Sequence, residues 1–300
     1  MPDGGVLADH VPKLSVVGAM MGDVTADRSA VYPLQGRDEE LAGLAGLIGL
    51  GGEARSSVVL LAGDAGVGKT RLLAELLDRA RSEGWRSVIG HCLDFGDSAL
   101  PYLPFTELLG RLAGESPDLA EALVTAHPAV THLQPGRRLL SGPGAVEVEN
   151  VERAELFEGV HAAFEQLAES KPLLVIVEDV HWADQSTRDL LSFLFARQFS
   201  GPVAVVASYR SDDLHRRHPL RATAAQWSRT PGVHRVQLAP LPDRAVRKLA
   251  SGSLRKRRIS RRRCERSWSP MTRAATCFPA SPRAAIASGC AATVWSTPSP

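Results

Sequence analysis

Short apolar runs alternate with longer amphipathic segments through the middle of the chain. Strand candidates span residues 58–62, 86–92, 173–178, 203–208 and 233–238. The stretches at 58–61 and 173–177 are aliphatic throughout, as is typical of strands buried on both faces. Apolar residues at helical spacing predict helices over residues 37–50, 71–81, 152–169 and 186–198. This alternation predicts an α/β fold, namely a five-stranded parallel sheet with helices on both faces.

One stretch interrupts the alternation. Residues 94–150 contain six prolines, which are Pro101, Pro104, Pro117, Pro128, Pro135 and Pro143. Proline interrupts both helices and sheet ladders. The stretch is therefore predicted to be an inserted region of helices and loops, and its pattern assigns it no role.

A glycine-rich turn joins the first predicted strand to the helix that follows it. Residues 63–70 read Gly-Asp-Ala-Gly-Val-Gly-Lys-Thr, which fits the phosphate-binding loop (P-loop) pattern. Gly63, Gly66 and Gly68 allow backbone N–H groups to curl around phosphate oxygens, and the next helix directs its positive dipole end at the same anion. The alternative, a strand-to-helix turn without a ligand, is disfavoured by this context. The chain is predicted to have a P-loop NTPase fold.

Each residue of the turn then has an expected role. Lys69 would reach the β and γ phosphates of a nucleotide, and the Thr70 hydroxyl would ligate Mg²⁺. A nucleoside triphosphate and Mg²⁺ are therefore the expected ligands of this turn. The predicted nucleotide-binding residues are Gly63, Asp64, Ala65, Gly66, Val67, Gly68, Lys69, Thr70 and Arg71.

Two carboxylates follow the third predicted strand. Glu178 and Asp179 come directly after an apolar run, so a parallel sheet delivers them to the same edge as the P-loop. One would hold the Mg²⁺ shell, usually through water, and the other could orient or deprotonate the attacking water. The register favours Glu178 for the metal and Asp179 for the base, but the reverse stays open, as does a solvated acidic pair.

Three further polar residues lie near the same edge. Arg210 ends the fourth predicted strand and would act as a γ-phosphate charge sensor, or be an ordinary exposed arginine. Asp184 is placed to cap the next helix. His181 could sense the γ phosphate or a neighbouring subunit, although a lone histidine in such a loop is more often structural. The basic loop at 215–221 is interpreted as solvated surface.

Charge and composition change near residue 250. The chain carries +2 overall, but residues 251–300 contain ten Lys or Arg and one Glu, a local charge of +9, so residues 1–250 carry −7. An acidic body argues against a nucleic-acid face on the main domain. The last fifty residues also lack periodicity, with one Leu and nine Ser. They are interpreted as a frameshift product or solvated disorder, with a basic phosphate-contacting arm as the alternative.

Other composition signals exclude several classes. The four cysteines show no Cys-x-x-Cys pair, which disfavours both zinc and a disulfide framework. No stretch has the length and apolarity of a transmembrane helix, and the N-terminus lacks the order of a secretory signal. The chain is expected to be cytoplasmic with free thiols and no membrane association.

Several motifs together resemble the ATPase module of large LuxR-type bacterial transcriptional regulators, a signal-transduction ATPase of the AAA-like P-loop superfamily. The resemblance covers residues 33–250, and its most specific parts are Glu-Asp-Val-His-Trp-Ala-Asp at 178–184 and Tyr-Arg-Ser-Asp-Asp at 209–213. It implies that the loop of Gly36 and Arg37 lies near adenine. It also implies an ATP/ADP switch that controls self-association.

Sequence pattern and composition, together with the resemblance, give an expected domain arrangement. Residues 1–32 are expected to be a disordered N-terminal segment, 33–240 the P-loop ATPase domain, 241–250 the start of a truncated helical lid, and 251–300 the basic tail. No sensor region or helix-turn-helix is recognisable, so the chain is not expected to read DNA sequence. The alternatives are an autonomous AAA-like ATPase acting on a protein partner, a module of a cyclase- or kinase-linked signalling protein, and a nonfunctional fragment.

Overall fold

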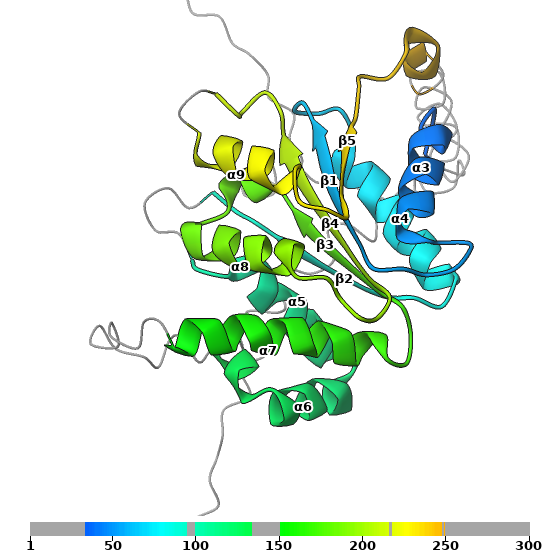
Figure 1. Cartoon of the computed structure of the whole chain (residues 1–300). Coiled ribbons are helices and arrows are strands. Elements are labelled where there is room, and N and C mark those ends of the chain that lie inside the picture. Colours follow the sequence, from blue (N-terminus) through cyan, green and yellow to red (C-terminus); the bar gives the residue numbers. More distant parts are fainter. Residues whose placement is uncertain (1–33, 95–99, 134–150, 216–217, 248, 250–300) are drawn as a thin grey trace, which may run out of the picture. The chain divides into compact units, whose positions relative to one another are not determined.

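The central feature is an all-parallel sheet with the strand order β2-β3-β4-β1-β5 (Figure 1). The computed structural model describes residues 34–94, 100–133, 151–215, 218–247 and 249. The sheet's strands are β1 (Ser57–Gly63), β2 (Arg86–His91), β3 (Leu173–Glu178), β4 (Val203–Arg210) and β5 (Val233–Gln237). The predicted five-stranded parallel sheet is confirmed.

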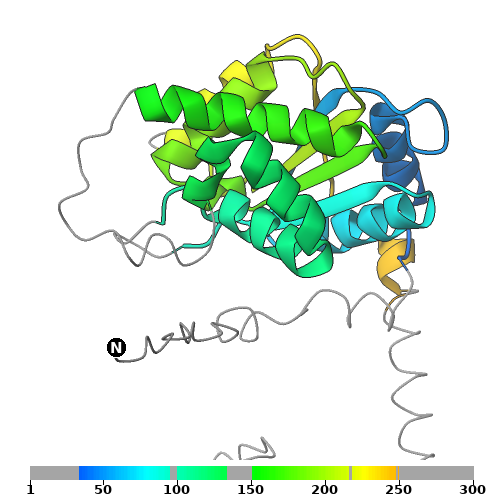
Figure 2. The ribbon, with the colours of Figure 1, turned by 90° about the horizontal axis from the view of Figure 1, so that it is seen from below.

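Helices cover both faces of this sheet. The helices α3 (Asp38–Ile48) and α4 (Lys69–Ser82) share one apolar core with it. The other core is shared by α5 (Leu103–Glu115), α7 (Val151–Ala168), α8 (Gln185–Ala196) and α9 (Pro219–Trp227). In Figure 2 the green helices lie on one side of the molecule and the blue and cyan helices on the other.

The strand β1 shows why its sequence is apolar almost without interruption. In β1 every residue is buried, and alternate side chains enter different cores. Val58, Leu60 and Ala62 join the core of α5 and α7, whereas Val59 and Leu61 join the core of α3 and α4. A strand covered on both faces has no polar side, so a continuous apolar run predicts it correctly.

Element boundaries differ slightly from the predicted ones. The helix predicted over 37–50 ends at Ile48, because Gly49 adopts a left-handed conformation (φ +78°) that terminates it. β4 continues past residue 208 to Arg210, while β2 and β5 each end one residue earlier than predicted. The assigned ends of helices and strands commonly differ by one or two residues between methods.

The inserted region is helical where it is described. After α5 come α6 (Pro117–Ala126) and the 3₁₀ helix η1 (Pro128–Leu133). Pro104, Pro117 and Pro128 each lie in the first turn of one of these helices, where a missing N–H breaks no hydrogen bond. Pro135 and Pro143 lie outside the described residues.

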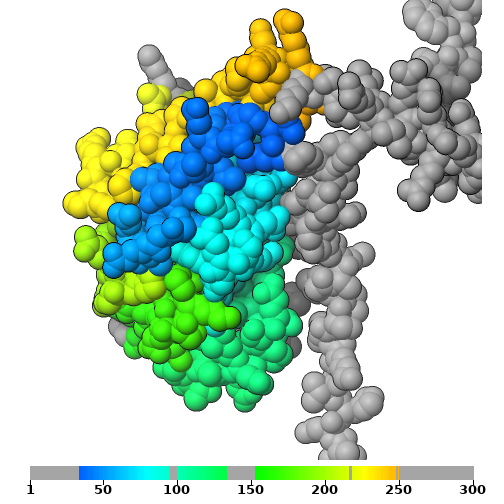
Figure 3. All heavy atoms as spheres, turned by 90° about the vertical axis from the view of Figure 1, so that its right-hand side faces the viewer, coloured from blue at the N-terminus to red at the C-terminus, as the bar shows by residue number. Residues whose placement is uncertain are grey.

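A last helical segment follows β5. Residues 243–247 are helical, within the stretch predicted to open a lid. Figure 3 shows this orange segment on the surface beside the blue α3 region. Ala245 lies against the chain just before α3, since a Cβ added to Gly36 would be 2.6 Å from its Cβ.

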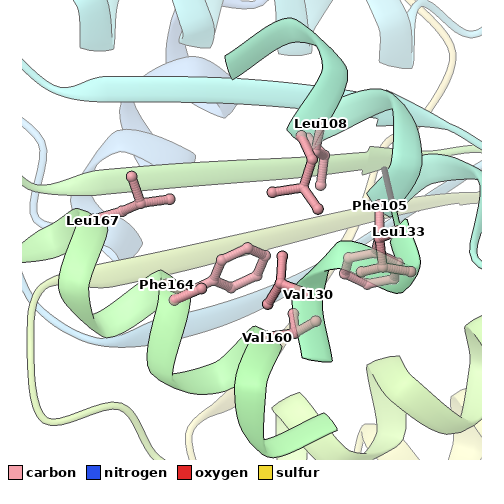
Figure 4. A pocket seen from close by; sticks show the side chains of 9 residues that line it. Phe105, Leu108, Val130, Leu133, Val160, Phe164 and Leu167 are labelled. Atoms are coloured by element: carbon pink, nitrogen blue, oxygen red, sulfur yellow. The ribbon is translucent and has the colours of Figure 1, made fainter. Parts of the chain in front are cut away.

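The inserted helices share a core with α7 (Figure 4). Phe105 and Leu108 of α5, Val130 and Leu133 of η1, and apolar side chains of α7 surround a small apolar cavity. The Phe105 and Phe164 rings are stacked, with centroids 6.5 Å apart. The insert is therefore packed onto the sheet domain rather than tethered to it.

The described residues include no helix with both the length and the apolarity to cross a bilayer. The chain divides into two units, and nearly all of the described residues belong to the first, Met1–Val246.

The insert approaches the sheet most closely at Gly90 of β2. A Cβ on this residue would lie 2.2 Å from the Pro104 carbonyl oxygen, a backbone atom that cannot rotate away. We expect Gly90→Ala to lower the free energy of unfolding by about 1–3 kcal/mol, because overpacking forces a backbone shift. Chemical denaturation measures this change.

Gly114 provides the matched control. It lies exposed in α5, and a Cβ there would meet nothing within 4 Å. Gly114→Ala should leave stability unchanged or raise it by up to about 1 kcal/mol through helix propensity. Equal stability of the two variants would contradict the close packing of the insert.

Candidate functional site

The carboxyl ends of three neighbouring strands form the candidate site. β1 ends at Gly63 and leads into the P-loop, β3 ends at Glu178, and β4 ends at Arg210. Gly63 and Arg210 are paired in register. The sequence-predicted residues of the P-loop, the acidic pair and Arg210 therefore come together at one sheet edge, where open parallel sheets place their ligand crevice.

The start of α4 is built to receive an anion. Gly66 and Gly68 have φ of +71° and +100°, which places both in the left-handed region that favours glycine. Among the described residues no side chain caps the N-terminus of α4, and its first turn carries no acidic residue. The N–H groups and the positive dipole end of this helix start fit a phosphate.

Lys69 is held close to this loop. Its side chain is 7% exposed, and Nζ donates hydrogen bonds to the carbonyl oxygens of Gly63 (2.7 Å) and Asp64 (3.0 Å). Burial lowers the pKa of Lys69, and the nearby charges of Asp179 and Asp212 oppose that effect. The ammonium group therefore lies between the P-loop and the acidic groups of the neighbouring strands.

Thr70 and Glu178 form a pair of oxygen ligands. The Thr70 Oγ1 hydroxyl donates to Glu178 Oε2 at 2.7 Å. Glu178 is 2% exposed, and burial raises its pKa against the effect of the Thr70 hydrogen bond. Within the described ranges no three His, Cys, Asp or Glu residues cluster as a metal cage. One carboxylate beside one hydroxyl suits Mg²⁺, which retains waters and binds few protein ligands.

Asp179 differs from its neighbour in backbone and in exposure. Its φ of +56° and ψ of +43° lie in the left-handed region, and its N–H donates to Ser208 Oγ at 3.2 Å. Non-glycine residues in this region are uncommon and concentrate at functional sites. The Asp179 side chain is 25% exposed, so it is accessible to water whereas Glu178 is not.

Arg210 lies over an aromatic ring. Its guanidinium carbon is 4.9 Å from the centroid of Trp182, and Nη1 is 3.6 Å from Asp213 Oδ2. Its side chain is one-third exposed. The ring and the carboxylate restrict a flexible cation to the same edge as Lys69.

Asp212 was assigned no role from the sequence. Its carboxylate accepts a hydrogen bond from the backbone N–H of Ala65, with both oxygens at 3.1–3.2 Å. That hydrogen bond lowers the pKa of Asp212. Its signals in the sequence were its place in the Tyr-Arg-Ser-Asp-Asp motif and its position two residues beyond the end of β4. The contact ties the P-loop to the β4 end.

Arg37 has a different set of partners. Its guanidinium is buried, and Nη2 donates to the carbonyl oxygens of Val67 (3.1 Å) and Ala239 (2.6 Å), while Nη1 pairs with Glu40. Arg37 therefore links the segment before α3 to the P-loop and to the end of β5. Its expected position near adenine stays a prediction.

Three smaller predictions can be compared with the structure. Asp184 caps α8, since its carboxylate accepts the Ser186 N–H at 2.9 Å, as predicted. Cys92 is buried and forms no disulfide, and the other three cysteines lie outside the described residues. The prediction of a solvated basic loop at 215–221 is wrong for its last three residues, because His218 caps α9, which starts at Pro219 and buries Leu220; residues 216–217 are outside the described part.

His181 is buried beside the site, and burial lowers its pKa against the effect of Asp179.

Another histidine at the strand ends, His91, was given no role by the sequence. His91 ends β2, in register with Glu178. Its Nδ1 is 3.0 Å from the Glu107 carboxylate, which also accepts the His91 backbone N–H and a hydrogen bond from Arg111. The pair connects the strand edge to α5.

The sheet, the uncapped helix after a glycine-rich loop, and the acidic strand end define a P-loop protein of the AAA type. The sequence pattern of the AAA ATPase domain matches residues 33–206, and the chain belongs to this family.

A relative and two solved structures give further comparisons. An uncharacterized protein of Rhizobium meliloti (strain 1021) is 30% identical over 229 residues, covering 66% of this chain and 22% of its own length. The chain thus spans about a fifth of that relative. A STAND protein with a tetratricopeptide repeat sensor from Pyrococcus horikoshii has a TM-score of 0.37 at 17% identity, covering 68% of this chain and 23% of its own. AMPPCP-bound DnaA from Aquifex aeolicus has a TM-score of 0.36 at 14% identity, covering 74% and 51%. These structural scores are too low to add to the family assignment.

The His91–Glu107 pair makes stability depend on pH. Burial alone would lower the pKa of His91, but the hydrogen bond and charge of Glu107 outweigh it and raise the pKa above 6.5. A raised histidine pKa gives stability that is complete below pH 6.5 and is lost as pH rises through the folded-state value. We expect this pH-dependent part of the free energy of unfolding, about 1–2 kcal/mol, to be absent in His91→Gln.

Unfolding free energies measured from pH 6 to 9 test this expectation. Glu107 has its pKa lowered and stays ionised across that window, so the difference between wild type and His91→Gln reports on His91. His234→Gln, on the exposed edge of β5, is the control. A wild-type profile parallel to that of His91→Gln would contradict the pairing.

Proposed function

We propose that the chain binds ATP together with Mg²⁺ at the carboxyl edge of the sheet. The observation that carries the proposal is the convergence of Lys69, the Thr70–Glu178 pair and Asp179 around the uncapped start of α4. Lys69 and the P-loop N–H groups would hold the phosphates. Thr70 and Glu178 would hold Mg²⁺, which supplies neutralising charge on the phosphate oxygens.

The proposed chemistry is slow hydrolysis of the terminal phosphate. Asp179, the more exposed carboxylate, is assigned as the base that orients a water and accepts its proton as the water oxygen attacks the γ phosphorus. The bond to the bridging oxygen breaks, and ADP leaves. Arg210, restricted by Trp182 and Asp213, is assigned to the charge on the γ phosphate.

We also propose a biological setting. The motifs at 178–184 and 209–213 support a nucleotide switch module of a LuxR-type transcriptional regulator that controls self-association. The much greater length of the R. meliloti relative is compatible with a module of a larger protein. Residues 33–240 are proposed as the ATPase domain and 241–250 as the start of its lid. Sequence-specific DNA recognition is not assigned to this chain.

An autonomous ATPase acting on a protein partner is the second candidate. The water-accessible Asp179 beside Lys69 favours it, because this arrangement could support repeated turnover. The two functions differ in kinetics. A switch retains about one nucleotide per chain and turns over slowly, whereas a partner-driven enzyme shows multiple turnovers that increase when the partner is added.

ATP binding is the first test. Lys69→Ala should weaken binding of a fluorescent ATP analogue by at least about tenfold, since a charge-assisted contact to phosphate is lost. Lys171→Ala, on the exposed turn before β3, is the matched control and should bind as wild type does. Glu178→Gln should remove most of the increase in affinity that Mg²⁺ gives. Equal affinities of Lys69→Ala and wild type would rule out the proposed site.

Hydrolysis is tested separately from binding. Asp179→Asn should keep ATP affinity within about threefold and lower the single-turnover hydrolysis rate by about 100-fold, as expected for loss of a general base. The asparagine tolerates the left-handed backbone that position 179 requires. An unchanged rate in Asp179→Asn would remove this residue from the base role.

A further inference from the structure

Asp212 places a negative charge directly on the P-loop. Its carboxylate oxygens Oδ1 and Oδ2 lie 3.1 and 3.2 Å from the backbone nitrogen of Ala65, whose N–H donates to them. The side chain is exposed, so no packing holds it in this one orientation. A carboxylate that accepts a P-loop N–H makes the kind of contact that a phosphate oxygen makes there. Asp212 and a phosphate therefore compete for the same donor.

The backbone around Asp212 is tied to the site. The Ser211 N–H donates to the carbonyl oxygen of Gly63 at 3.2 Å, and the Leu214 N–H donates to the Ser211 carbonyl oxygen at 3.3 Å, which closes a turn. The Ser211 hydroxyl also accepts a hydrogen bond from the Gln237 amide at 3.1 Å. Rotation of the Asp212 side chain can release the loop N–H, but the negative charge then still lies beside the loop.

This charge lies on the side of the site that the outermost phosphate would occupy. The hydrogen bond from Ala65 is the largest cause of the lowered pKa of Asp212, and the nearby charges of Lys69 and Arg210 lower this pKa further. Lys69 would reach the β and γ phosphates, and Arg210 is assigned to the γ phosphate. The ionised carboxylate thus faces the two cations that the γ phosphate would also need.

The neighbouring Asp213 has a different orientation. Its Oδ2 is 3.6 Å from Arg210 Nη1 and 3.5 Å from Nε2 of His181, which lies in η3 (Val180–Trp182). The charge of Asp213 is therefore directed at the end of β4 and at the turn after β3. Of the two adjacent aspartates, Asp212 is the one whose carboxylate lies on the P-loop.

We propose that Asp212 is a specificity-determining residue that lowers the affinity of the site for a nucleoside triphosphate relative to the diphosphate. This inference rests on the proposed function. The γ phosphate brings additional negative charge next to the carboxylate, and like charges a few ångströms apart repel. A diphosphate leaves the Ala65 N–H to Asp212. A triphosphate must displace the carboxylate from this N–H and remain close to its charge.

Two variants separate the charge of Asp212 from its contact. Asp212→Asn keeps an oxygen that can accept the Ala65 N–H and removes the charge, whereas Asp212→Ala removes both. Displacement of a fluorescent ATP analogue by unlabelled ATP and by ADP, each with excess Mg²⁺, gives the two affinities. We expect both variants to raise the affinity for ATP relative to ADP by about three- to tenfold over wild type, because one like charge is lost. In Asp212→Asn the affinity for ADP should stay within about twofold of wild type.

Ionic strength provides a readout that a purely structural contact would not change. The difference in ATP-to-ADP preference between wild type and Asp212→Asn should shrink as NaCl is raised from about 0.1 to about 1 M, because the screening length falls from about 10 to about 3 Å. Asp78→Asn is the matched control, since it removes an exposed carboxylate from the second half of α4. It should keep the wild-type preference.

The outcomes are distinct. If Lys69→Ala binds ATP as tightly as wild type, the proposed function fails and this inference with it. If Lys69→Ala weakens binding but Asp212→Asn has the wild-type ATP-to-ADP preference, only the inference fails. It also fails if Asp212→Ala weakens ATP and ADP equally, which would indicate a structural contact, or if salt leaves the altered preference unchanged. Partial unfolding cannot imitate the expected result, because it lowers both affinities by the same factor.

Discussion

The complete burial of β1 is the constraint on which the rest of this structure depends. Its backbone is paired with β4 on one side and β5 on the other, and the side chains of residues 58–62 alternate between the two cores. A strand held in this way cannot slip by one residue, because that would move all its side chains to the opposite core. Gly63 and the P-loop after it are therefore fixed relative to the neighbouring strand ends.

Hydrogen bonds between the strand ends then bring the residues of the candidate site together. The Asp179 N–H reaches Ser208 of β4, Asp212 reaches the P-loop at Ala65, and Thr70 reaches Glu178. Each contact joins two segments that are more than 25 residues apart in sequence. These contacts hold the charged side chains of the strand ends at one edge of the sheet, an arrangement that suits a single anionic ligand.

The sequence predicted the features that have a local cause. Uninterrupted apolar runs identified the buried strands, and the glycine and lysine spacing at 63–70 identified the loop. Asp212, the His91–Glu107 pair and the partners of Arg37 were missed because each depends on which strand ends become neighbours. The Tyr-Arg-Ser-Asp-Asp motif contains Asp212, but the sequence does not show that its partner is the Ala65 N–H.

Arg37 connects the P-loop to the segment that follows β5. One guanidinium nitrogen is shared between the Val67 carbonyl in the P-loop and the Ala239 carbonyl where the chain leaves the sheet. Any displacement of the loop at Val67 must lengthen one of these bonds or carry the exit segment with it. The segment in which the chain leaves the sheet at Ala239 is thus linked to the P-loop through the Arg37 side chain, although the two carbonyl groups lie far apart in the sequence.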